Sequence, residues 1–261
     1  LGEDVTLLQA VELILKRVRD GGDGALHEMS SRLDGVETDT LEVPPSAVAE
    51  AYSMVPGELI EALGLSARRV RKFHEAGLPM SWMDFTEGYG ETINPVGRVG
   101  AYVPGGTARL PSTVLMTAVP AKVAGVDEVI VATPPSQGRF PDPAVLVAAD
   151  IAGVDRVYQV GGAQAIAAMA YGTETIPKVD MVCGPGNIFV TLAKKLLYGE
   201  VGIDGLYGPT ETVVVADDSA NPTLCAADLV AQAEHDILAT AVLITTSNRV
   251  AEAVEKELEV R

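Results

Sequence analysis

Apolar residues recur at helical spacing through the first part of the chain. Between Thr6 and Arg19 they follow a period close to 3.6, which predicts an amphipathic helix. Glycine and proline then mark where helices end and begin, because glycine suits a helix end and proline suits the first turn. The remaining features predicted for residues 1–77 are a stop at Gly21-Gly22, a second helix over 24–33 ending at Gly35, and helix starts at Pro45 and Pro56-Gly57.

After residue 96 the pattern changes to short apolar runs that alternate with helical segments. Most runs are apolar on both faces, which is typical of a parallel sheet covered by helices on two sides. Residues 78–95 are expected to form an ordered surface connection. The predicted strands are 97–103, 128–132, 156–160, 179–183, 212–216 and 241–245, and the predicted helices are 112–124, 143–152, 163–171, 188–197, 222–238 and 249–258.

The run from Thr212 to Ala216 is β-branched and bounded by Pro209 and Asp217, which predicts a buried strand. The fold class that follows for the whole chain is α/β, with parallel sheets flanked by helices and a helical N-terminal region.

Composition excludes several classes of protein. With 48% hydrophobic residues the chain is expected to build a well-filled core. The net charge of −17 argues against binding nucleic acid or an anionic membrane through a broad basic face. Cys183 and Cys225 are far apart in the sequence, which favours reduced intracellular thiols. We expect a cytoplasmic protein, because no apolar run has membrane-spanning length and the first residues lack the features of a secretory signal.

Three glycine-rich turns follow predicted strands, where parallel sheets usually bind ligands. The dinucleotide fingerprint G-x-G-x-x-G is absent, so two interpretations stay open: a nucleotide or other anion site, or tight turns alone. Gln164 and Asn187, which lie directly after two of the turns, are candidates for hydrogen bonds to a carboxamide, ribose or adenine edge. The turns are Pro104-Gly105-Gly106, Gly161-Gly162-Ala163-Gln164 and Gly184-Pro185-Gly186-Asn187.

The stretch from Gly208 to Asp236 contains a candidate metal site. Asn221 and Pro222 mark a helix start, and Gln232 and His235 stand three residues apart on one face of that helix. An amide oxygen and an imidazole nitrogen placed in this way can hold two positions of a zinc ion. The alternative is that both side chains are solvated.

Other polar residues carry weaker indications. The basic cluster Arg68, Arg69, Arg71 and Lys72 lies at helical spacing, which favours a solvated face over an anion site. No ligand set surrounds His27 or His74, so both are interpreted as structural.

Taken together, these motifs resemble one family, histidinol dehydrogenase, the zinc-containing and NAD-dependent enzyme of histidine biosynthesis. The resemblance runs from about residue 6 to the last residue, with six motifs in the order and spacing of the family. The matching stretches are residues 97–108, 111–116 (Pro-Ser-Thr-Val-Leu-Met), 161–166 (Gly-Gly-Ala-Gln-Ala-Ile), 184–187 (Gly-Pro-Gly-Asn), 208–211 (Gly-Pro-Thr-Glu) and 231–236 (Ala-Gln-Ala-Glu-His-Asp).

The resemblance implies roles for individual residues and for the assembly. In the family, zinc holds an amino alcohol through its amine and imidazole nitrogens, while a Glu-His pair supplies acid and base for two hydride transfers, from L-histidinol through histidinal to L-histidine. Members are intertwined homodimers. The positions that match are Tyr102, Gln164 and Asn187 for NAD, Thr210 for substrate, and Gln232 and His235 for both zinc and substrate.

The chain departs from the family pattern in two ways. Thr210 stands where the family usually has serine, and Arg109-Leu110 replaces a small or aromatic pair, so a relative that oxidises another small polar alcohol is an alternative. The family's Glu-His pair and two further zinc ligands, an Asp and a His, fall beyond Arg261, which leaves no catalytic residue in this chain. We therefore expect these residues alone to bind zinc poorly and not to oxidise histidinol. A non-catalytic module that binds NAD or protein is the third hypothesis.

The family's arrangement also implies a domain division. Residues 98–210 are expected to form a nested Rossmann-like domain. Residues 1–97 and 211–261 would form a second, discontinuous and incomplete α/β domain with a helical N-terminus.

Overall fold

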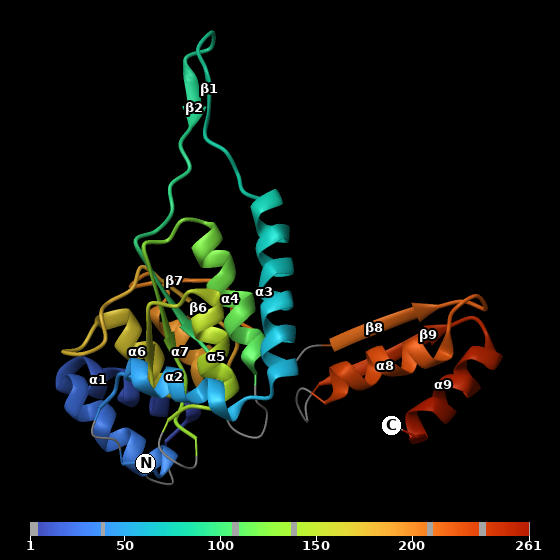
Figure 1. The fold of residues 1–261 in the computed structure, drawn as a ribbon, viewed down its shortest axis with the longest axis horizontal. Helices are drawn as coiled ribbons and strands as arrows, with labels where there is room; N and C mark the ends of the chain where they lie inside the picture. Colours follow the sequence, from blue (N-terminus) through green and yellow to red (C-terminus); the bar gives the residue numbers. More distant parts are fainter. Residues whose placement is uncertain are drawn as a thin grey trace. The chain divides into compact units, whose positions relative to one another are not determined.

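The computed structural model describes residues 5–37, 40–105, 110–136, 140–207, 211–234 and 239–260. The chain divides into two compact units, Leu1–Leu206 and Tyr207–Arg261 (Figure 1). Both combine parallel strands with helices, so the predicted α/β class is confirmed.

A five-stranded parallel sheet forms the centre of the first unit. Its strands run in the order β5-β4-β3-β6-β7, so the chain builds outward from β3 in one direction and then returns to add β6 and β7 on the other side. This is the common Rossmann order, with a reversal between β3 and β6. The strands are β3 (Arg98–Tyr102), β4 (Glu128–Ala132), β5 (Arg156–Tyr158), β6 (Met181–Cys183) and β7 (Gly202–Ile203).

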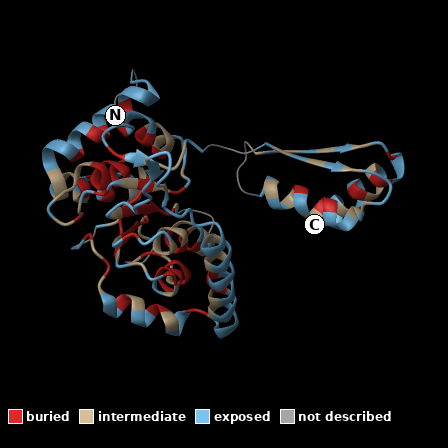
Figure 2. Ribbon diagram, turned by 90° about the horizontal axis from the view of Figure 1, so that it is seen from above, coloured by how far each residue is buried: buried red, intermediate tan, exposed pale blue. Residues whose placement is uncertain are grey.

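Alternate residues of these strands enter two separate hydrophobic cores, because successive side chains of a strand point to opposite faces. Val99, Ala101 and Val131 pack with α4 (Pro111–Val123) and α5 (Pro143–Ala152). Tyr102 and Ile130 pack with α6 (Gly162–Tyr171) and α7 (Ile188–Leu197) on the other face. Figure 2 shows the buried residues concentrated in these layers. None of the described helices is long and apolar enough to cross a membrane.

The N-terminal helices form an outer layer on both sides. α1 (Leu7–Met29) packs on α6 and α7, whereas α2 (Pro45–Met54) packs on α5 and α3 (Gly57–Ala76) packs on α4 and α5. The predicted helix starts at Pro45 and Gly57 are confirmed. The grouping of residues 1–97 with 211–261 into one domain stays a prediction.

The predicted break at Gly21-Gly22 is present as a kink inside α1. Gly22 has φ 52° and ψ −137°, which is outside helical geometry, and a π-helical turn, η1 (Ser30–Asp34), follows the helix and ends at Gly35. The carboxylate of Glu174 lies at the kink and accepts a hydrogen bond of 2.8 Å from the backbone N–H of Asp23. The kink therefore leaves the backbone N–H of Asp23 to donate outside the helix, and the carboxylate of Glu174, which follows α6 in the chain, accepts this hydrogen bond.

Residues 78–95 contain a short antiparallel hairpin of β1 (Trp82–Asp84) and β2 (Tyr89–Glu91). The sequence predicted an ordered surface connection here and did not identify these two strands. The Asp84 carboxylate accepts hydrogen bonds from the backbone N–H groups of Thr86 and Glu87 and thereby closes the turn. Trp82 and Tyr89 meet edge to face, with ring centroids 5.9 Å apart.

The second unit is a two-stranded parallel sheet with helices on one face. β8 (Glu211–Ala216) pairs with β9 (Thr240–Thr245), and the residues of α8 (Pro222–Ala233) and α9 (Asn248–Val260) form a small core with them. Val213, Val215, Val242 and Ile244 point away from that core and are exposed. The expectation of a buried strand at 212–216 was therefore wrong, because a β-branched run does not reveal that only one face of its sheet is covered.

Gly22→Ala tests the kink. A Cβ at position 22 would lie 2.3 Å from Glu174 Oε2, and a positive φ strains any L side chain, so we expect the free energy of unfolding to fall by about 1–3 kcal/mol. Gly24→Ala is the matched control, because nothing lies within 4 Å of its added Cβ; it should raise stability by about 0.5–1 kcal/mol. Urea unfolding measures both, and equal effects would contradict the assignment.

Alkaline pH should destabilise the fold through two partly buried groups, Tyr52 and Cys183. Burial, followed by the hydrogen bond to Asp150, raises the pKa of Tyr52 from 10.0 to about 12. Burial, with a contribution from the Asp204 carboxylate, raises the pKa of Cys183 from 9.0 to about 11. The unfolded chain loses these protons first, so the stability is complete below pH 9 and falls as the pH rises toward 12. Urea unfolding across this range should show the decline, and Tyr52→Phe and Cys183→Ala should each flatten it.

Candidate functional site

Two of the glycine-rich turns meet on one proline at the carboxyl end of the sheet. A Cβ at Gly105 would lie 2.4 Å from Pro134 Cγ, and one at Gly161 would lie 2.7 Å from Pro134 Cβ. The turns after β3 and β5 thus pack against the turn after β4. These two glycines are required by packing between loops, which supports the tight-turn interpretation for them.

The third turn closes on the strand next to it. Gly184 follows β6 with φ 113°, and a Cβ there would lie 2.1 Å from the carbonyl oxygen of Tyr102 at the end of β3. Because β3 and β6 are the strands between which the order reverses, this contact is at the topological switch point, where open α/β sheets bind their ligands. The sequence prediction that the turns share one edge of the sheet is therefore confirmed.

Tyr102 is built into the core of this edge. Its side chain is only 3% exposed, and its hydroxyl accepts a hydrogen bond of 3.0 Å from the backbone N–H of Gly162. The residue thereby joins the end of β3 to the first turn of α6. Its proposed contact with NAD stays a prediction, and the observed role is to position the Gly161-Gly162 turn.

Gln164 is a polar side chain with little exposure to solvent at the carboxyl edge of the sheet. It is 2% exposed, and its side-chain amide forms no hydrogen bond within the part of the chain that the structure describes. Its Oε1 would lie 2.5 Å from a Cβ at Gly162, a residue with φ 65°. Its polar atoms are not among the fully buried, unpaired side-chain atoms of the described residues, which are Ser30 Oγ and Gln159 Oε1. The amide of Gln164 therefore keeps some contact with solvent, and its hydrogen-bonding groups are free for a ligand.

Asn187 has a structural role that the sequence analysis did not assign. It is exposed and caps α7, because its Oδ1 accepts hydrogen bonds from the backbone N–H groups of Phe189 (3.1 Å) and Val190 (3.2 Å). The carbonyl oxygen is therefore occupied in capping. The amide nitrogen remains the group of Asn187 that is able to donate to a ligand.

A buried ion pair holds the Gly184 turn and was not predicted. Lys194, 2% exposed, donates from Nζ to the carbonyl oxygen of Gly184 (3.0 Å) and to the carboxylate of Asp204. Asp204 in turn accepts from the backbone N–H of Gly184 at 2.7 Å. Both backbone polar groups of Gly184 are thus fixed. The sequence contains one indication of this burial. Val190, Lys194 and Leu197 are spaced so that they share one face of α7, and this is the buried face.

Cys183, directly before this turn, is not an activated nucleophile. Burial raises its pKa to about 11, so the thiol is protonated at neutral pH.

In the second unit, the structure describes one of the two predicted zinc ligands. Gln232 lies in the last turn of α8, and its Oε1 accepts a hydrogen bond of 2.8 Å from the hydroxyl of Thr212 at the start of β8. His235 and Thr210 lie outside the described residues. Among the described residues, no group of three or more His, Cys, Asp and Glu side chains is placed to hold a metal ion. The hydrogen bond from Thr212 fixes the orientation of the Gln232 side chain. Its role as a zinc ligand stays a prediction.

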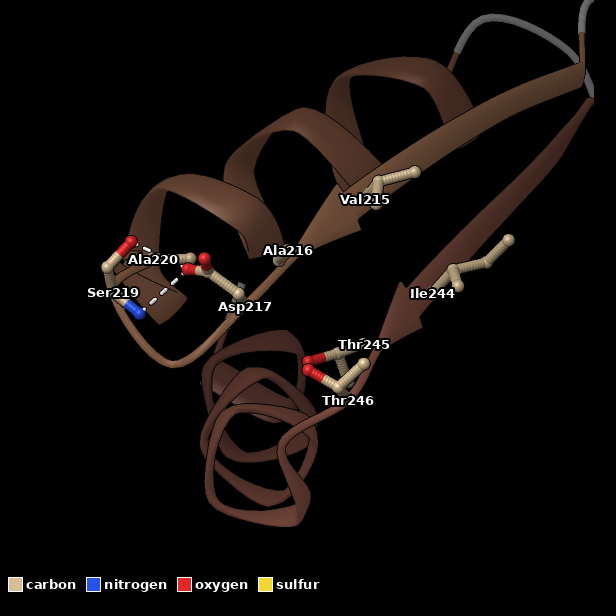
Figure 3. A pocket seen from close by; sticks show the side chains of 8 residues that line it. All are labelled: Val215, Ala216, Asp217, Ser219, Ala220, Ile244, Thr245 and Thr246. Atoms are coloured by element: carbon tan, nitrogen blue, oxygen red, sulfur yellow. Dashed lines mark hydrogen bonds between the residues drawn. The ribbon is translucent and has the colours of Figure 1, made fainter.

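A hollow of about 440 Å³ occupies the other end of the same sheet, after β8 and β9 (Figure 3). The Asp217 carboxylate there accepts hydrogen bonds from the hydroxyl (2.6 Å) and backbone N–H (2.9 Å) of Ser219, which lower its pKa. This carboxylate is already satisfied, and the hollow lies away from Thr212 and Gln232. Its lining comprises Val215, Ala216, Asp217, Ser219, Ala220, Ile244, Thr245 and Thr246.

Comparison with known proteins gives one consistent result. The family profile described as histidinol dehydrogenase matches residues 2–261. The chain is similar to the histidinol dehydrogenase of Synechococcus sp., with 52% identity over 96% of this chain and 59% of that protein. It is similar to the histidinol dehydrogenase of Clostridium acetobutylicum as well, with 47% identity over 99% of this chain and 61% of that protein.

The same relationship holds for the structure. The crystal structure of histidinol dehydrogenase from Elizabethkingia anophelis superposes with a TM-score of 0.93 and 34% identity, covering 100% of this chain and 61% of that one. The chain thus spans about three fifths of the length of the relatives it matches. Since the family profile covers nearly every residue and the fold agrees throughout, the chain belongs to the histidinol dehydrogenase family.

Proposed function

We propose that the protein acts in histidine biosynthesis by oxidising L-histidinol through histidinal to L-histidine, with NAD as oxidant, as a cytoplasmic homodimer. Membership of the histidinol dehydrogenase family supports the reaction class. The observation in the structure that carries the cofactor assignment is Gln164, a residue only 2% exposed in the first turn of α6, at the carboxyl edge of a Rossmann-order sheet. Its side-chain amide has no hydrogen-bond partner among the described residues.

In this proposal the first unit binds the cofactor. When bound, NAD supplies the acceptor of hydride. The amide of Gln164 accepts a hydrogen bond from a polar edge of NAD and donates one to it. Asn187 donates a hydrogen bond to NAD from its amide nitrogen. Tyr102 contributes by holding the N–H of Gly162 and hence the turn on which Gln164 is mounted. The absence of a side chain at Gly184 lets the ends of β3 and β6 approach each other at the crevice.

The proposal assigns substrate and metal to residues near the second unit's sheet. Thr210 offers a hydroxyl to substrate, and Gln232 and His235 supply two zinc ligands that also lie close to substrate. The hydrogen bond from Thr212 fixes the direction of the Gln232 carbonyl, as outer-shell partners of metal ligands commonly do. The remaining ligands and the Glu-His pair belong, by resemblance, to sequence after residue 261, so residues 1–261 alone should show little zinc affinity and no NADH formation from histidinol.

A second candidate substrate class is favoured by Thr210. Threonine keeps the hydroxyl of the serine that is usual in the family and adds a methyl group, and this difference in sequence favours a small polar diol other than histidinol. NADH formation by the full-length protein with histidinol and with other diols compares the two: a higher kcat/KM for histidinol supports the first proposal, and the reverse supports the second.

Gln164→Leu tests the cofactor assignment. We expect residues 1–261 to bind NAD saturably in a calorimetric titration, and the variant to bind about 5- to 30-fold more weakly, because about 1–2 kcal/mol of hydrogen bonding is lost. Gln232→Leu, at the proposed metal position, is the control and should leave NAD affinity unchanged. Equal NAD affinity for Gln164→Leu and the unmodified chain would refute the role.

Lys194→Met tests whether the buried ion pair positions the turn for NAD. Removing the lysine takes away the cation that faces the partly buried Asp204 carboxylate, so the free energy of unfolding should fall by about 1–3 kcal/mol. Where the variant remains folded, NAD should bind more weakly. Adding Asp204→Asn to it should recover part of the stability, and Lys195→Met, at the exposed neighbour on the same helix, should change neither property. A folded Lys194→Met protein with normal NAD affinity would leave the pair a purely structural role.

A further inference from the structure

Thr212 places a hydroxyl on the face of β8 that otherwise packs apolar groups. Side chains alternate along a strand, so residues 212, 214 and 216 share one face. Thr212, Val214 and Ala216 are each partly buried there, beneath α8 and α9. Threonine has nearly the shape of valine, but its hydroxyl needs a hydrogen-bond partner where the side chain is covered. A polar contact therefore explains the residue type at this position better than apolar packing does.

The partner of this hydroxyl is the side chain of Gln232. Thr212 Oγ1 donates a hydrogen bond of 2.8 Å to Gln232 Oε1, across 20 positions of the sequence. Gln232 is partly buried and lies in the last turn of α8, which packs beside β8 (Figure 1). The contact thus joins the beginning of β8 to the end of α8 and holds the oxygen of the Gln232 amide in one place.

The same oxygen is the side-chain atom of Gln232 that is able to bind a metal ion, because the amide nitrogen only donates hydrogen bonds. The usual zinc ligands are thiolate sulfur, imidazole nitrogen and carboxylate oxygen. An amide oxygen carries no formal charge, so its attraction for a cation depends strongly on the direction of its lone pairs. It has two of them, and a hydrogen bond from Thr212 is therefore compatible with a bond to a metal. Gln232 Oε1 fits a zinc ligand whose orientation matters.

We propose that Thr212 is a positioning residue of the zinc site. Through its hydrogen bond it holds Gln232 Oε1 in the orientation that the metal requires, and it thereby raises the affinity of the protein for zinc. Fixing the side chain in this way reduces the conformational freedom that Gln232 loses when the metal binds. The inference rests on the zinc site of the proposed function and adds a residue that acts on the metal only through Gln232.

Thr212→Val tests the role of the hydroxyl, because it removes this group and keeps the shape of the side chain. In the full-length protein, competition with a chromophoric zinc chelator should show about 10- to 100-fold weaker zinc binding, as is common when an outer-shell partner is lost. Thr212→Ser keeps the hydroxyl and should retain most of the affinity. Thr246→Val makes the same change at an exposed threonine beyond the other end of the sheet and should leave zinc affinity unchanged.

A double-mutant cycle separates positioning from a structural contribution. Gln232→Ala should lower zinc affinity by itself, and adding Thr212→Val should cause little further loss, because the hydroxyl acts through Gln232. Urea unfolding of each variant in zinc-free buffer reports the stability of the fold. A purely structural role of Thr212 would lower this stability and leave the zinc affinity of the folded variant unchanged.

The possible results distinguish the positioning role from the proposed function. Normal zinc affinity in Thr212→Val, an equal loss in Thr212→Ser, or additive losses in the double variant overturns the positioning role and leaves the zinc site intact. A full-length protein that binds no zinc overturns both the zinc site and the positioning role. NAD titration of the same samples reports the cofactor assignment independently of either result.

Discussion

The buried contact between Lys194 and Asp204 is the interaction on which the candidate cofactor edge depends. It fixes the carbonyl and the N–H of Gly184, and this glycine is the residue that lets β6 close against the carbonyl of Tyr102. Lys194 is deeply buried and Asp204 is partly buried. A buried ion pair adds little net stability compared with apolar packing, but one partner without the other is costly. Its effect is therefore to make a single backbone conformation strongly preferred at the point where the strand order reverses.

Each face of the five-stranded sheet packs against its own set of helices. One core unites α4 and α5 with α2 and α3, and the other unites α6 and α7 with α1. The glycine turns stand between these cores at the carboxyl edge, and two of them are packed on Pro134. A rigid edge suits a cofactor site because the polar groups that face a ligand are then held before it arrives. Gln164 fits this arrangement. Packing holds its side chain in place, whereas its amide forms no hydrogen bond with the described residues.

Much of the fold could be predicted because its elements have strong local signals. Pro45, Pro143 and Pro222 each begin a helix, and the strands after residue 96 are continuous apolar runs. The missed elements lack such signals: β7 has two residues, and β1 and β2 have three each. The exposure of Val213 and Val215 depends on which elements cover β8, and this information does not reside in β8 itself.

The position of the glycine turns was predictable, and the contacts of the candidate site were less so. The sequence placed these turns after parallel strands, and the structure has them at one edge of the sheet. The capping role of Asn187 and the burial of Lys194 depend on tertiary contacts, which the sequence does not display. For Gln164, the residue type and position came from the motif, whereas its lack of a hydrogen-bond partner is a property of the packed structure.

The kink in α1 has a consequence for how the chain is made. The hydrogen bonds that Glu174 and Thr175 form with Asp23 join residues 151 and 152 positions apart. During synthesis at about 5–20 residues per second, α1 therefore waits roughly 8–30 s before the residues that complete its kink exist. Throughout that interval its apolar face lacks the cover that α6 and α7 provide in the folded unit. A helix near the start of the chain is thus among the last elements able to reach its final place.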